Sequence, residues 1–145
     1  MLFLARNVDS SSVAINSIAQ SLEISRKFLE KILVELGSEG LVSSKKGRSG
    51  GYFISKDLNN ISLADIVRIL EGPIALLPCA SHRFYEPCKE CESPDKCSLQ
   101  DALVNVRNST VYSLKSIKIS DILLKEEKLN RGILKPQRPI PFKEK

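Results

Sequence analysis

Residues 24–55 have the sequence ISRKFLEKILVELGSEGLVSSKKGRSGGYFIS, in which one helical pattern is followed by two strand patterns. Ser25 is a favourable N-cap for the helix, and Gly40 is placed to end it. Residues spaced by three or four positions give this helix one apolar side. We expect the following side chains to be buried on that side: Phe28, Leu29, Ile32, Leu33 and Leu36.

The second half of this stretch predicts a β-hairpin. The β-prone runs 41–44 and 52–55 are separated by a basic, glycine-rich turn. Residues 43–56 include four cations and no acid, and the cations are Lys45, Lys46, Arg48 and Lys56. The hairpin is therefore expected to have a positively charged tip.

A shorter helical pattern precedes the stretch, with Ile15, Ile18, Ala19 and Leu22 at helical spacing. Ser12 and Asn16 are alternative caps for it. Two short helices joined by a tight turn form a helix-turn-helix, and a hairpin after them makes a winged helix. Residues 2–5 look like the end of a helix whose start is missing.

A winged helix of this charge suits double-stranded DNA, because the second helix can present its first turn to base edges while wing cations meet the backbone. Glycines at the tip would let the main chain approach a phosphate. The alternative is a solvated hairpin in a winged helix that binds proteins. The candidate DNA contacts on the residue pattern alone are Ser25, Arg26, Lys27, Lys45, Lys46 and Arg48.

Residues 61–73 have the clearest helix boundaries in the chain. Ser62 and Asp65 form a capping-box pattern, and Gly72 followed by Pro73 ends the helix. We interpret this helix as scaffold that completes a winged-helix domain over residues 1–74.

All four cysteines lie in the loop of residues 75–97, at Cys79, Cys88, Cys91 and Cys97. Clustered thiols in a reducing compartment favour a metal or redox site. The spacings x8, x2 and x5 fit an iron–sulfur cluster better than a paired zinc knuckle. Unrelated thiols and a disulfide are the remaining alternatives.

A helical pattern then covers residues 98–124, with an apolar stripe too long for one small domain to bury. We expect the stripe to pack on a second copy and form a homodimer, which would place two recognition helices on two half-sites. The stripe consists of Leu99, Leu103, Val106, Thr110, Leu114 and Ile117, widened by Val104 and Val111. Residues 125–145 are expected to form a flexible basic tail.

The 145 residues have 22 basic and 17 acidic side chains, a net charge of +5, and fit one domain with an appendage. Neither a membrane-spanning run nor a good signal peptide is evident, so a cytoplasmic protein is expected. The sequence also lacks an acid–base dyad, an activated nucleophile pair and a phosphate loop. We therefore do not expect an enzyme.

In this order, the features resemble the family of winged-helix transcription regulators that includes IscR, NsrR and CymR. The resemblance covers residues 1 to about 124 and rests on five motifs. These are Ile18-Ala19, ISRKFLE at 24–30, GLV at 40–42 with GRSGGY at 47–52, ISLADIV at 61–67 with Glu71-Gly72, and Cys91-x5-Cys97.

The resemblance implies a mainly α-helical fold with a hairpin wing and a long C-terminal dimerisation helix. It also implies a sequence-specific DNA-binding regulator, often a repressor, with base contacts from 25–27 and Glu30 and backbone contacts from Gly47, Arg48, Ser49 and Gly50. Several members hold a 2Fe–2S or 4Fe–4S cluster in the loop and sense iron, oxygen, nitric oxide or redox state, although some hold none.

This chain departs from the family pattern in two ways. It has four cysteines where members usually have three cluster ligands, so Cys79 and Cys88 are alternative third ligands. The family's first helix begins about a dozen residues earlier. The alternative function is an iron–sulfur or zinc-binding redox or interaction protein that uses its winged helix for protein contacts.

Overall fold

The computed structural model of the chain describes residues 1–8, 12–47, 49–91 and 93–139. These parts are mainly α-helical with one antiparallel hairpin, as predicted. The helices are α1 (Leu2–Arg6), α2 (Ile15–Ser21), α3 (Arg26–Ser38), α4 (Leu63–Leu70), α5 (Ser98–Ser116) and α6 (Ile119–Asn130), and the strands are β1 (Val42–Lys45) and β2 (Gly51–Ile54). Three short 3₁₀ turns complete the order: η1 (Leu58–Asn60), η2 (Pro78–Ala80) and η3 (Pro94–Lys96).

Helices α2 and α3 form the expected helix-turn-helix. The Ser25 hydroxyl caps α3 by accepting the Phe28 amide at 3.2 Å. Leu29, Leu33 and Leu36 are the residues of α3 that are fully buried. The prediction that Phe28 is buried with them was wrong, because its side chain is 56% exposed. Position 28 lies about 100° around the helix from Leu29, which turns it away from the core.

The wing pairs Val42 with Ile54 and Lys45 with Gly51 at its two ends. A third segment joins it, because Val13 and Tyr52 exchange backbone hydrogen bonds of 2.9 and 2.8 Å. Gly51 is required here, since a Cβ at this position would overlap the Val13 carbonyl group. The wing is thereby fixed to the start of α2.

The cap of α2 differs from both alternatives that the sequence offered. Its N-cap is Ala14, which has no side-chain hydrogen bond to the helix. The Ser12 hydroxyl instead donates to the Ser49 carbonyl at 2.9 Å. Asn16 lies within the helix. The tertiary contact with the wing has therefore replaced a local cap.

The capping box at the start of α4 is present as predicted. The Ser62 hydroxyl accepts the Asp65 amide, and the Asp65 carboxylate accepts the Ser62 amide at 3.0 Å. Partial burial opposes ionisation of Asp65, but the Ser62 hydrogen bonds and the charges of Lys118 and Arg68 outweigh it and lower its pKa. Gly72, with φ of +82°, follows the end of the helix.

The helical pattern of residues 98–124 does not form one helix. Helix α5 ends at Ser116, and α6 begins at Ile119 and continues to Asn130, past the expected end at Leu124. The break occurs because residues 117–119 pair with the strand-like start of α4. The Leu63 amide donates to the Ile117 carbonyl at 2.9 Å, and the Ile119 amide donates to the Ile61 carbonyl at 3.0 Å.

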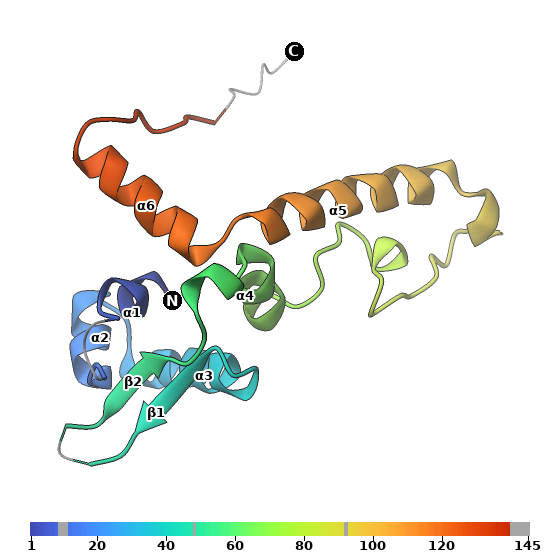
Figure 1. The fold of residues 1–145 in the computed structure, drawn as a ribbon. Coiled ribbons are helices and arrows are strands. Elements are labelled where there is room, and N and C mark those ends of the chain that lie inside the picture. The colour runs from blue at the N-terminus through green and yellow to red at the C-terminus, as the bar shows by residue number, and fades with distance from the viewer. Residues whose placement is uncertain (9–11, 48, 92, 140–145) are drawn as a thin grey trace.

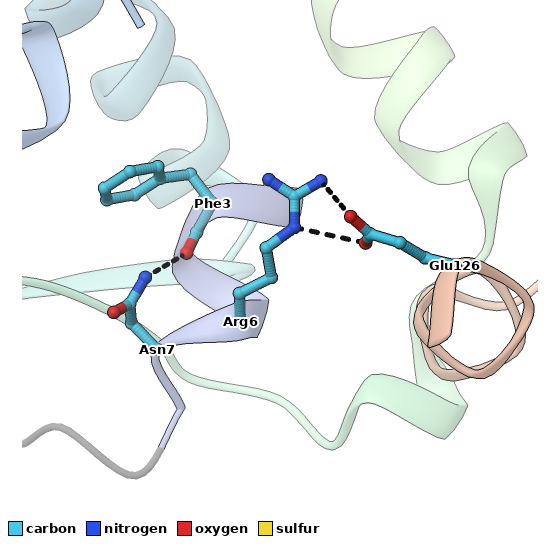
Figure 2. A network of polar contacts seen from close by, with 4 residues as sticks. All are labelled: Phe3, Arg6, Asn7 and Glu126. Atoms are coloured by element: carbon cyan, nitrogen blue, oxygen red, sulfur yellow. Dashed lines mark hydrogen bonds and ion pairs between the residues drawn. The ribbon is translucent and has the colours of Figure 1, made fainter. Parts of the chain in front are cut away.

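Helix α6 returns to the winged helix and packs against α1 and η1 (Figure 1). Ile119 and Ile61 belong to the buried core and are 1% and 0% exposed. Figure 2 shows the polar contact at the edge of this interface, where the Arg6 guanidinium meets Glu126 through two nitrogens at 2.8 and 3.1 Å. The first residues of the expected flexible tail are therefore an ordered part of the domain.

Helix α5 and the cysteine-containing segment extend together away from the winged helix (Figure 1). The segment lies alongside α5, and α5 contacts both η2 and α4. Nowhere in the described ranges does a helix combine the length and apolarity that crossing a membrane requires.

Candidate nucleic-acid interface and cysteine loop

An open hollow of about 380 Å³ lies between the start of α2, the start of α3 and the wing. Arg26 comes from α3, and Lys45 and Lys46 come from the wing. Acidic residues are absent from the described lining of this hollow. The fold therefore brings the two groups of predicted DNA-binding cations, about twenty residues apart in sequence, to one concave positive surface.

The first turn of α3 is exposed, as a recognition helix requires. Ser25, Arg26 and Lys27 all face solvent, and Glu30 is half-buried. The Arg26 Nε donates to the Glu30 carboxylate at 2.9 Å. An exposed pair at this spacing contributes only about 0.3–0.5 kcal/mol, so DNA can compete for both side chains.

Phe28 is a candidate contact that the sequence analysis assigned to the core. Its exposed ring lies one turn into α3, next to Lys27. An exposed apolar side chain on a recognition helix can contact the methyl group of thymine. The signal that could have identified Phe28 is its offset of about 100° around the helix from Leu29, which places it at the edge of the apolar side.

The wing tip presents Lys45, Lys46, Gly47 and Ser49 to solvent, with Gly50 half-buried. Arg48 lies outside the described residues. Gly50 has a structural role within the hairpin, because a Cβ there would come within 2.5 Å of the Lys45 carbonyl oxygen. The glycine pattern of the tip thus reflects how the hairpin closes, in addition to any contact with phosphate.

The cysteine loop brings two of its thiols together. Cys91 lies close to Cys97 and Cys88, and the Cys91 amide donates to the Cys88 carbonyl at 3.2 Å. Partial burial raises the pKa of the Cys91 thiol, and the neighbouring thiols of Cys97 and Cys88 raise it further. The Cys97 sulfur also accepts the Gln100 amide at 3.4 Å and so caps α5.

Cys79 is joined to the same region through the backbone. The Gln100 side-chain amide donates to the Cys79 carbonyl at 2.8 Å. This bond uses the main chain of Cys79 and does not involve its thiol. Thiolate sulfur is the ligand that iron–sulfur clusters and zinc take, so the donor atoms are chemically suitable. Within the described ranges, however, no three potential ligands converge on one point. The pair of Cys91 and Cys97 fits a metal group, and a third ligand would have to move.

Helix α5 keeps part of its apolar stripe uncovered. Val111 is buried, whereas Leu99 and Val106 are 63% and 50% exposed. The side of α5 that contacts α4 is therefore the side of Val111, at the edge of the predicted stripe. The centre of the stripe faces solvent.

Comparison with known proteins identifies the family. The Rrf2 family, described as iron-dependent transcriptional regulator, matches residues 1–125. The chain is 35% identical over 119 residues to an rrf2-like HTH-type transcriptional regulator of Rhodobacter capsulatus, covering 82% of this chain and 79% of the relative. It is also 30% identical to protein aau3 of Rhizobium meliloti, over 96% of this chain and 88% of that one.

Solved structures agree. CymR, the global cysteine regulator of B. subtilis, has a TM-score of 0.64 at 30% identity, over 83% of this chain and 84% of its own. IscR of T. potens has a TM-score of 0.67 at 25% identity, over 88% and 80%. The expected family and fold are confirmed, and the relatives are transcriptional regulators rather than enzymes. The chain belongs to the Rrf2 family of DNA-binding winged-helix transcriptional regulators.

Proposed function

We propose that the chain binds specific double-stranded DNA sites as a homodimer in the cytoplasm, acting as a repressor, and that its cysteine loop senses a signal. The observation that supports DNA contact most directly is the acid-free hollow shared by Arg26, Lys45 and Lys46. Residues 25–27, Phe28 and Glu30 would contact base edges and nearby phosphates. Residues 45–50 would contact the backbone.

A salt titration tests the DNA surface. A preferred duplex is selected from random sequences, and its affinity is measured by fluorescence anisotropy over a series of salt concentrations. Lys46→Ala should lower the slope of log affinity against log salt by about one, because one phosphate contact is lost. Lys125→Ala removes an equal charge on α6, away from the wing, and should leave the slope unchanged. Equal slopes for Lys46→Ala and the unmodified protein would contradict the assignment.

The exposed stripe on α5 supports the homodimer. Leu99 and Val106 lie on a helix that projects from the domain, and a second copy would remove them from water. Val106→Glu should shift the chain towards monomer in sedimentation-velocity experiments. Lys115→Glu, half a turn round the helix, is the control that should remain dimeric. A monomeric unmodified chain at micromolar concentration excludes this proposal.

The thiol pair supports sensing. Cys91 and Cys97 would hold an iron–sulfur cluster, with Cys88 as the third ligand because its carbonyl accepts the Cys91 amide at 3.2 Å and keeps the two residues close. A bound cluster supplies a redox- and iron-dependent change of charge in the loop. Because a thiol must lose its proton to bind iron, loading should release protons and increase with pH.

Anaerobic reconstitution with iron and sulfide tests this part. The unmodified chain should take up both and absorb in the visible range, whereas Cys91→Ser and Cys97→Ser should not. Cys79→Ser should retain the cluster, since its thiol is not part of the contact pair. A parallel sample is offered zinc, and binding of zinc without colour, together with no uptake of iron and sulfide, would favour the zinc-binding alternative.

A further inference from the structure

A separate pocket of about 170 Å³ opens where the end of α4, the segment 81–84 and α5 meet. It is distinct from the hollow beside the wing, since the two share no lining residue. Its described walls consist of Arg68, Gly72, Pro73, Ile74, Ser81, His82, Arg83, Phe84 and Arg107.

The pocket has a strong positive bias. Three guanidinium groups and one imidazole line it, and its described lining includes no carboxylate. Arg68 and Arg83 also border an adjoining hollow, whose acidic residues are Glu35, Glu39 and Asp65. Across the described ranges, none of these acids comes within ion-pair distance of the pocket's arginines. The arginines are therefore not neutralised by a short ion pair of the fold.

Arg107 supplies the second observation. One terminal nitrogen donates to the Asn108 side-chain oxygen at 2.8 Å, but the Nε is buried and has no acceptor among the described residues. A buried donor of a charged group without a partner costs free energy. An anion in the pocket would provide acceptors for the guanidinium groups of Arg107, Arg68 and Arg83 together.

The remaining walls are apolar or contribute a neutral donor. Pro73, Ile74 and Phe84 form the apolar part. The Ser81 hydroxyl is buried and accepts the Phe84 amide at 3.1 Å, which leaves its proton available for a ligand oxygen. A few convergent polar groups beside an apolar wall are typical of small-molecule pockets.

We propose that this pocket binds a small organic anion, with a phosphate or carboxylate group held by the three arginines and an apolar portion against Phe84. The pocket lies where the winged helix, the cysteine loop and α5 join, so a bound anion would connect all three. This inference is independent of the DNA-binding and cluster proposals, because its test measures ligand binding alone.

Isothermal titration calorimetry on the full chain at physiological ionic strength tests the pocket, with phenyl phosphate, benzoate and inorganic phosphate as probes. We expect saturable binding of phenyl phosphate, tighter than that of inorganic phosphate. Benzoate shows whether a carboxylate also satisfies the arginines. Arg107→Gln and Arg83→Gln should each weaken phenyl phosphate about ten- to a hundredfold, the value of one charged hydrogen bond.

Lys115→Gln is the matched control, since it removes an equal charge from an exposed position of the same helix. Arg83 lies on an exposed segment, so its variant separates loss of binding from loss of folding. Absence of saturable binding would overturn the proposal. So would an equal loss in Lys115→Gln, which indicates a general charge effect, or equal affinity for inorganic and phenyl phosphate.

Discussion

Replacement of Ile119 by alanine tests whether α6 is part of the folded domain. Ile119 is 1% exposed, lies in the same core as Ile61, and donates its amide to the Ile61 carbonyl at 3.0 Å. Loss of a fully buried isoleucine side chain costs about 2–5 kcal/mol in transfer and cavity terms. For a domain of this size that is roughly a 10 °C fall in Tm.

Two comparison variants separate this packing from its surroundings. Leu124→Ala changes an apolar side chain of the same helix that is 55% exposed, and should cost below about 1 kcal/mol. Arg6→Ala removes the ion pair with Glu126 shown in Figure 2, whose side chains are 49% and 34% exposed. Such a pair contributes about 0–1 kcal/mol. We therefore expect Ile119→Ala to lower the free energy of unfolding more than either Leu124→Ala or Arg6→Ala.

The assay is urea denaturation followed by circular dichroism at one fixed protein concentration, because an oligomer's stability depends on concentration. The unmodified chain and all three variants are compared at the same pH and salt. If Ile119→Ala loses no more stability than Leu124→Ala, α6 is not docked on the core. The account of the helix break at residues 117–118 would then be wrong.

Asp65→Asn should destabilise the chain by about 0.5–2 kcal/mol at neutral pH. The lowered pKa of Asp65 stabilises the fold above the unfolded-state pKa, and this stabilisation is lost as the pH falls through the folded-state pKa, so the difference between the two chains should shrink below about pH 4. A difference in urea denaturation that does not depend on pH would contradict this. Phe28→Ala should weaken binding to the selected duplex and change the free energy of unfolding by less than about 1 kcal/mol. A larger loss of stability would show that the ring is buried. Iodoacetamide should alkylate Cys91 more slowly than Cys88, as measured by peptide mass spectrometry, because the raised pKa of Cys91 leaves less of it as thiolate. Cys97→Ala should speed that reaction, and an unchanged rate would remove Cys97 as a cause.

Local signals made the winged helix predictable. Ser25, Ser62 and Asp65 are caps whose partners lie three residues away, so the sequence around each contains nearly all of the relevant chemistry. The hairpin was equally accessible, because a basic glycine-rich turn between two β-prone runs has few alternatives. The cations of the wing were also evident from the sequence, and their contact with DNA stays a prediction.

Predictions that depended on distant partners fared less well. Ser12 is a good cap in isolation, yet its hydroxyl donates to Ser49 because Val13 pairs with Tyr52 in the wing. The helical period from 98 to 124 gives no sign of a break, since Ile117 and Lys118 are compatible with a helix. Their backbone leaves the helix because the start of α4 offers hydrogen-bond partners there.

The sequence by itself determined the helix-turn-helix and the wing, because these depend on local periodicity, capping and turn residues. Its motifs carried the resemblance to the family, and the positions of the four cysteines placed them in one loop. Tertiary structure decided which faces are covered. It exposed Phe28, divided the long helical pattern into α5 and α6, and joined α6 to the core. It also placed Arg68, Arg83 and Arg107 around one pocket, because only packing of α4, the loop and α5 brings side chains so distant in sequence together.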